Sequence, residues 1–229
     1  MMQPCTRYNE MKEFASFEEG FEACRQNGQG FPFVIRACRS FSLMTEAVIR
    51  NQISKERIVK GYVKGEVQLS TGQSALDAWD SQCLGFNIVD SVSSRGYSLL
   101  LPKALEIINR KADVEESLWL AYVLSPANPL QCGEIHIDPP FGSGWQYLAV
   151  GKKTWYVMDR SLFSIDDYNS SIAGDKEFDA PDMDELSKHF EIISATIGPG
   201  DFLSCPIDWP HAVKSLEGSL GISGYSESH

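Results

Sequence analysis

Several classes of protein are excluded by what this chain lacks. Its cysteines are scattered without Cys-x-x-Cys spacing, at positions 5, 24, 38, 83, 132 and 205. Neither a zinc knuckle nor a disulfide framework is therefore indicated. No apolar run approaches the ~18 residues that span a bilayer, and the first residues lack the basic start and apolar stretch of a signal peptide. We expect an intracellular protein, in the cytoplasm or the nucleus, with no membrane association.

Basic residues are also scarce. The 229 residues include 20 Lys and Arg against 31 Asp and Glu, which gives a formal net charge of −11. Binding to nucleic acid phosphates needs clustered basic side chains, so direct nucleic-acid binding is not expected. The acidic balance favours a basic peptide, a basic protein or a small amine as partner.

The N-terminal half, residues 1–115, mixes helical and strand patterns. Phe14, Phe17, Phe21 and Cys24 follow helical spacing. The patterns predict helices at 14–27, 44–51 and 98–110, and strands at 31–38 and 59–69, the latter followed by a turn at STGQS. We interpret this half as an α/β support for the remainder of one single domain, residues 1–229.

The second half, residues 116–229, changes to short strands separated by turn residues. Strands are predicted at 117–125, 133–137, 145–150, 153–158, 191–197, 201–206, 211–216 and 219–226. Such a series predicts a β-sandwich or barrel. A polar insert at 159–191, with one short helix at 183–190, is interpreted as a solvated loop, the alternative being a lid over a substrate.

Histidine is the other scarce residue, with four in the chain. In EIHID, His136 and Asp138 lie two apart, so on a strand their side chains share one face. His211 opens a later strand. Two imidazoles and one carboxylate with open positions suit a non-haem Fe(II) oxygenase, whereas zinc more often has a fourth protein ligand. By itself the pattern is weak, because a histidine in a β protein is more often a polar core or surface residue.

Two segments carry a family resemblance. HIDPPFGSGWQYLAVGKKTW and the later GPGDFLSCPIDWPHAVKSLEGSLGISGYS resemble the jumonji C (JmjC) family of Fe(II)- and 2-oxoglutarate-dependent oxygenases, especially its lysyl hydroxylase-like branch. FPFVIRA resembles an early strand of the same family. The resemblance implies a double-stranded β-helix, the cupin-like jelly roll. It also implies that His136, Asp138 and His211 are the ligands of Fe(II).

The same resemblance implies a site for 2-oxoglutarate. The family's co-substrate lysine falls on Lys153, and its small hydroxyl residue falls on Ser223. Gln146 stands where the branch has Asn, and Tyr122 or Trp119 takes the place of an upstream aromatic residue. A distal carboxylate inside a barrel requires a cation and a hydroxyl donor. Alternation along the strand places Lys153, Trp155 and Val157 on an inward face, with Lys152 outward.

The resulting expectation is an oxygenase that hydroxylates, or N-demethylates, a C–H bond of a protein, a peptide or a small molecule. Asp138, where many demethylases of the family have Glu, favours hydroxylation. Two alternatives stay open: a cupin-type metalloenzyme that does not use 2-oxoglutarate, and a catalytically silent JmjC module that binds a partner. We expect a monomer, because the chain ends 18 residues after His211, without the C-terminal helices through which relatives dimerise.

Overall fold

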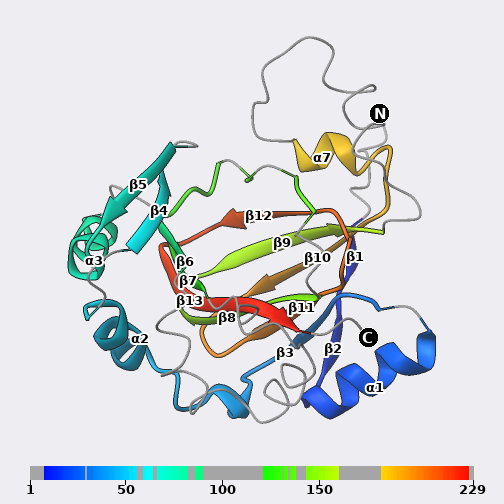
Figure 1. The fold of residues 1–229 in the computed structure, drawn as a ribbon. Helices are drawn as coiled ribbons and strands as arrows, with labels where there is room; N and C mark the ends of the chain where they lie inside the picture. The colour runs from blue at the N-terminus through cyan, green and yellow to red at the C-terminus, as the bar shows by residue number, and fades with distance from the viewer. Residues whose placement is uncertain are drawn as a thin grey trace.

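The computed structural model describes residues 8–28, 30–55, 59–63, 66–81, 86–89, 121–130, 132–133, 135–137, 143–159 and 182–226. Over this part the chain is mostly β-sheet, with two mixed sheets facing each other and helices outside them (Figure 1). The arrangement is compatible with the predicted β-sandwich. The helix predicted at 98–110 and insert residues 160–181 lie outside the described residues.

The larger sheet has seven strands. The pair at one edge, β2 with β3, is parallel, and the other pairs are antiparallel. In spatial order the strands are β2 (Lys12–Phe14), β3 (Phe33–Ile35), β11 (Phe202–Cys205), β8 (Ser143–Val150), β13 (Ser219–Ser226), β7 (Ala121–Ser125) and β6 (Phe86–Val89). The predicted strands at 145–150, 201–206 and 219–226 are confirmed here, and the one predicted at 117–125 is confirmed over Ala121–Ser125, since 117–120 lie outside the described residues.

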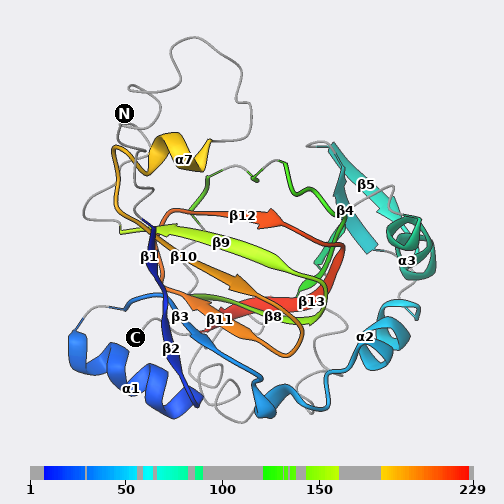
Figure 2. The ribbon, with the colours of Figure 1, turned by 180° about the vertical axis from the view of Figure 1, so that it is seen from behind.

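The smaller sheet has four strands, and its edge strand β1 is parallel to its neighbour. In spatial order the strands are β1 (Tyr8–Glu10), β10 (Ile192–Ile197), β9 (Lys153–Met158) and β12 (His211–Ser215). Between β1 and β2 the chain crosses from one sheet to the other, which Figure 2 shows from behind. Met11 lies at this crossing and is buried between the sheets.

The interior between the sheets is a narrow apolar layer. Trp155 and Val157 from β9 meet Leu148 from β8 and Leu203 from β11 there. Tyr156 and Met158, the alternate residues of β9, pack on the outer side of the smaller sheet. Side chains of a strand alternate between its two faces, so this division fixes which residues of each strand point inward.

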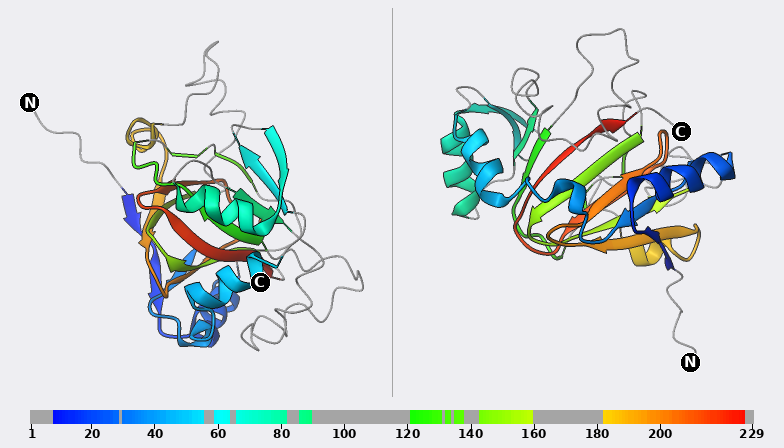
Figure 3. Two further views of the ribbon diagram at one scale, coloured as in Figure 1. Left: turned by 90° about the vertical axis from the view of Figure 1, so that its left-hand side faces the viewer. Right: turned by 90° about the horizontal axis from the view of Figure 1, so that it is seen from below.

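Helices cover the outer face of the seven-stranded sheet. They are α1 (Phe17–Asn27), α2 (Glu46–Ile53) and α3 (Gly72–Asp80), and Figure 3 shows α1 at one end of the sheet and α2 with α3 at the other. The side chains of Ser16, Thr45 and Thr71 accept backbone N–H groups at the three helix starts. A cap of this kind contributes about 1 kcal/mol.

Their apolar stripes pack against aromatic side chains of the sheet. Phe17 of α1 contacts Phe202 edge to face at a centroid distance of 4.7 Å, and Phe41 stacks on Tyr147 at 4.5 Å. Phe41 lies in a short 3-10 helix, η1 (Arg39–Phe41). Trp145 belongs to the same cluster and is buried there, so it packs within the core.

Three local predictions were wrong. Residues 59–69 form a hairpin, β4 (Val59–Val63) and β5 (Glu66–Ser70), in place of one strand. STGQS is not a simple turn: Thr71 caps α3, because its hydroxyl accepts the N–H of Ser74. Among the described residues of the strand predicted at 133–137, only an isolated bridge forms, in which His136 and His211 exchange two backbone hydrogen bonds.

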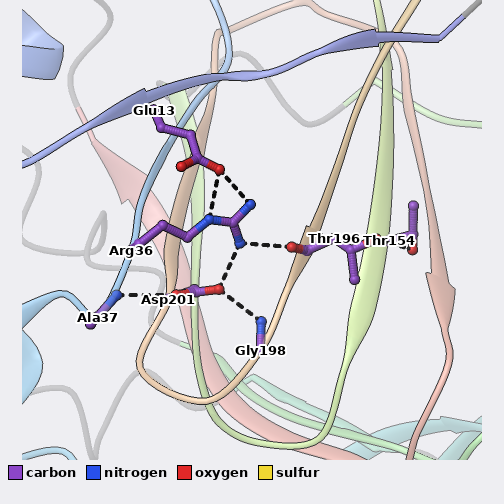
Figure 4. A network of polar contacts seen from close by, with 7 residues as sticks. All are labelled: Glu13, Arg36, Ala37, Thr154, Thr196, Gly198 and Asp201. Carbon is purple, nitrogen blue, oxygen red and sulfur yellow. Dashed lines mark hydrogen bonds and ion pairs between the residues drawn. The ribbon is translucent and has the colours of Figure 1, made fainter.

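A polar network fixes the N-terminal strands to the turn between β10 and β11 (Figure 4). The Arg36 guanidinium donates to Glu13 and Asp201, and also to the Thr196 carbonyl at 2.7 Å. Asp201 in turn accepts the backbone N–H groups of Ala37 and Gly198. The Asp201 carboxylate thus closes the GPGD turn, which explains an aspartate at that position without any catalytic role.

The smaller sheet is covered on its outer face by α7 (Met183–Leu186), which is shorter than the helix predicted at 183–190. Met183 and Leu186 pack on Met158 and Ile192. In the part of the chain that the structure describes, no helix has the length and apolarity needed to cross a membrane.

Candidate metal centre and buried lysine

His136 and His211 are brought directly opposite each other at one end of the interior. The N–H of His136 donates to the His211 carbonyl at 3.0 Å, and the N–H of His211 donates back at 2.9 Å. Their ring centroids are 4.3 Å apart. His211 is 2% exposed, whereas His136 is exposed. Two imidazoles far apart in the sequence therefore meet at a spacing at which both can bind one cation.

The environment of His211 selects one tautomer. Its Nδ1 lies 3.1 Å from the backbone carbonyl of Trp209, and a carbonyl only accepts, so Nδ1 carries the proton. Nε2 is left with a lone pair, which is the form in which histidine binds a metal. The turn that precedes His211 contains Asp208, whose φ of 64° is a left-handed conformation that aspartate tolerates better than most residues do.

The His211 ring is also held by stacking. The Trp155 ring lies 5.1 Å away and only 24° from parallel. The Trp155 indole N–H donates to the Gln146 Oε1 at 3.2 Å, across the interior from the other sheet. Both side chains are buried, at 7% and 4% exposure. Gln146 thus fixes Trp155, which limits rotation of the distal imidazole.

Lys153 lies at the other end of the same inward row of β9. The side chain is 4% exposed, and its ammonium donates to Ser125 Oγ at 2.9 Å. Burial lowers the pKa of Lys153 to about 7, because a charged ammonium loses its hydration there. Lys152 beside it is exposed. The predicted inward direction of Lys153 and outward direction of Lys152 are confirmed.

Neither Ser223 nor Tyr122 lies next to Lys153. Ser223 lies opposite Gln146 in the pairing of β13 with β8, nearer to Trp155. Tyr122 belongs to the helix-covered cluster with Leu124 and Ile222, on the face of β7 away from Ser125. One residue of strand register decides which face a side chain occupies, so Tyr122 and Ser125 point to opposite faces of β7. Trp119 lies outside the described residues.

Asp138 also lies outside the described residues, so the predicted third ligand is not placed. Among the described residues no group of three or more His, Cys, Asp or Glu side chains is close enough to bind one metal ion. The pair His136 and His211 nevertheless fits two positions of a metal centre, since one backbone pairing sets their spacing and the proton of His211 lies on Nδ1, which gives Nε2 the form of a metal ligand. The donor set suits a divalent transition metal.

Ser125 is the residue of this region that sequence reasoning missed. A single serine carries no periodic signal, and its importance comes from facing a buried lysine across the interior. The pairing of β7 with β13, which sets Ser125 opposite Ser219, involves segments far apart in the chain. The alternation of β7 could have assigned Ser125 and Tyr122 to opposite faces.

Comparison with known proteins adds no assignment. A scan against protein-family models and a search of curated proteins each found no match. The structure itself defines a β-rich protein with two facing sheets. An imidazole pair lies at one end of the interior and a buried lysine at the other.

Proposed function

We propose that the protein is an Fe(II)- and 2-oxoglutarate-dependent oxygenase of the JmjC type, which hydroxylates a C–H bond of its substrate. The observation that carries the proposal is the placement of His211 and Lys153 on one inward face across two paired strands. His211 pairs with Val157 and Ser215 pairs with Lys153, so the two side chains lie about four residues, or roughly 13 Å, apart along the strands. A five-carbon dicarboxylate can bridge a metal at one end and a flexible lysine at the other.

The path of the chain supports the same family. From β8 onward the strands divide between the two sheets in the order larger, smaller, smaller, larger, smaller, larger. A double-stranded β-helix distributes its strands in this way between two facing sheets. The jelly-roll, cupin-like form of the fold is part of the proposal.

In this proposal His136, Asp138 and His211 hold the iron. Bound iron supplies activation of O₂, with the electrons coming from oxidative decarboxylation of 2-oxoglutarate to succinate and CO₂. The Trp209 carbonyl keeps the proton of His211 on Nδ1, and Trp155 keeps the ring in place. Exposed His136 and Ile137 leave this end of the interior accessible to a substrate.

Lys153 neutralises the distal carboxylate of 2-oxoglutarate. A lysine that is 4% exposed and whose partner among the described residues is a neutral hydroxyl is costly to keep charged. A carboxylate beside it offsets that cost and fixes the length of the co-substrate that fits. This use explains why a lysine occupies a position where an apolar residue would be more stable.

The substrate class follows from charge. A formal net charge of −11 favours a basic peptide, a basic protein or a small amine, with the protein acting as a monomer. If the oxidised carbon is an N-methyl group, loss of formaldehyde from the hydroxylated product gives demethylation. Hydroxylation is the simpler outcome, and Asp138 favours it.

Anaerobic titration of the Fe(II) protein with 2-oxoglutarate tests the proposal. We expect a visible charge-transfer absorption that is lost in His136→Ala and weakened in Lys153→Ala. Lys152→Ala is the matched control, because Lys152 is the exposed neighbour of Lys153. A cupin that does not use 2-oxoglutarate would be insensitive to Lys153→Ala, and a silent binding module would give no absorption and no succinate.

A further inference from the structure

Lys153 has an incomplete set of partners for a buried cation. Its ammonium has three donors, and in the described part of the chain it donates to Ser125 Oγ at 2.9 Å. Among the described residues no carboxylate forms an ion pair with it. Ser125 accepts this hydrogen bond, so its own hydroxyl proton remains available to a further acceptor.

Ser219 is a second buried group without a partner at the same place. Its side chain is 0% exposed, and its Oγ has no hydrogen-bond partner among the described residues. In the pairing of β13 with β7, Ser219 lies directly opposite Ser125. Side chains that are directly opposite in an antiparallel pair share a face, with Cβ atoms roughly 5 Å apart. Ser125 reaches Lys153 from that face, so Ser219 faces the same position.

Two turns close this end of the sandwich around the three side chains. The carbonyl of Lys152 accepts the N–H groups of Leu216 and Glu217, at 2.8 and 3.1 Å. Gly151, at φ of 84°, approaches so closely that a Cβ there would meet the Gly218 carbonyl oxygen at 2.2 Å and the Ser219 Cβ at 2.7 Å. Only glycine allows this contact. The site is therefore a built part of the fold, closed to water at the lysine end.

Ser223, the serine that the family resemblance favours, lies elsewhere along β13. It is four residues beyond Ser219, or roughly 13 Å at the usual rise of a strand, and it pairs with Gln146. Gln146 contacts Trp155, which stacks on His211. Ser223 therefore lies at the level of the histidine end, and Ser219 at the level of Lys153.

On the basis of the proposed function, we infer that Lys153, Ser125 and Ser219 together bind the distal carboxylate of the co-substrate, with Ser219 supplying the hydroxyl donor in place of Ser223. An ionised carboxylate accepts several hydrogen bonds. Lys153 Nζ, the free proton of Ser125 and the unpaired hydroxyl of Ser219 provide three donors. The buried hydroxyl of Ser219, which has no partner among the described residues, thereby gains one in the complex.

The test compares two keto acids in the Fe(II)-loaded protein under anaerobic conditions. 2-Oxoglutarate has the distal carboxylate, and 2-oxopentanoate has the same carbon chain with a methyl group in its place. The ratio of their dissociation constants isolates the distal site from the metal end. We expect Ser219→Ala to reduce the preference for 2-oxoglutarate at least about tenfold, the usual effect of losing a hydrogen bond to a charged group. The affinity for 2-oxopentanoate should stay unchanged.

Ser223→Ala is the competing variant, and Lys152→Ala is the control. A loss of preference in Ser223→Ala with none in Ser219→Ala overturns the inference and leaves the proposed function intact. A wild-type protein that binds neither keto acid overturns both. A loss of preference in Ser219→Ala alone supports both.

Stability without ligand provides a second readout. Ser219→Ala removes an unsatisfied buried hydroxyl, so the unfolding midpoint of the ligand-free protein should stay equal or rise while the preference for 2-oxoglutarate falls. Ser125→Ala removes the hydrogen-bond acceptor that Lys153 has among the described residues, so the unfolding midpoint of this variant should fall. A lower midpoint in Ser219→Ala would mean that the hydroxyl serves the fold, which contradicts the inference.

Discussion

The two ends of the sandwich interior differ in what surrounds their polar groups. At the histidine end, His136 is exposed, and a backbone carbonyl satisfies the buried nitrogen of His211. At the lysine end, Lys153 is buried with one neutral partner, and Ser219 has none among the described residues. The histidine end is open to solvent, whereas the lysine end is closed and holds a buried cation for which no carboxylate partner lies among the described residues. A site that takes up O₂ and a substrate at one end and anchors a co-substrate at the other needs this difference.

The largest effect is expected at the histidine end. His211→Ala should weaken Fe(II) or Co(II) binding by more than about 100-fold, because even outer-shell partners of a metal contribute about 10- to 100-fold. Absorption of the Co(II) protein during titration measures it. His189→Ala is the control, since His189 is exposed and lies near Glu185 of α7. If His211→Ala binds Co(II) as tightly as the wild type does, the histidine pair does not bind the metal.

The lysine end should give a distinctive pH dependence of stability. The pKa of Lys153 is about 7 in the folded protein and ordinary when unfolded, so the unfolded state binds an extra proton between about pH 7 and 10.5. Stability should therefore rise with pH in that window. Lys153→Met should abolish this rise and stabilise the protein at pH 7 by up to about 5 kcal/mol, as an upper bound from the shift. Urea unfolding at a series of pH values measures both.

The same substitution should act in the opposite direction on binding. Lys153→Met is expected to lower the affinity for 2-oxoglutarate at least about 30-fold, because a buried charge interaction of about 2 kcal/mol is lost. Isothermal titration of the metal-loaded protein measures it, with Lys152→Met as control. In the wild type the affinity should fall as pH rises above about 7, because binding then requires uptake of the proton that Lys153 has lost. An affinity that is independent of pH and of Lys153 would separate the lysine from the co-substrate.

The smallest effect is expected between the two ends. Gln146→Leu leaves the buried indole N–H of Trp155 without its partner, at a cost of about 1–3 kcal/mol in unfolding free energy. Metal affinity should fall only severalfold, because Trp155 can still stack on His211. Trp fluorescence and a Co(II) titration measure the two effects. Gln146→Glu, which retains an acceptor, should recover most of the stability if the hydrogen bond is the cause.

Sequence alone gave access to features that depend on local alternation. The inward direction of Lys153 follows from its place in the KTWYVM strand. That His136 and His211 would meet was implied by the family resemblance and not by alternation, because the two lie 75 residues apart. Helix α3 was missed because Thr71-Gly72 is typical of a turn as well as of a helix start. Ser125 and Ser219 were missed because serine gives no periodic signal, and their importance depends on which distant strands pair. The face of Tyr122 could not be predicted from the residue alone, since aromatic residues suit either side of a buried sheet.

The most direct measurement is an anaerobic crystal structure of the protein with Mn(II) and 2-oxoglutarate. The account predicts the metal on His136, Asp138 and His211, with the distal carboxylate contacting Lys153, Ser125 and Ser219. A metal bound away from the histidine pair would contradict it. A structure in which Lys153 still donates to Ser125 and no carboxylate lies beside Lys153 would contradict it as well.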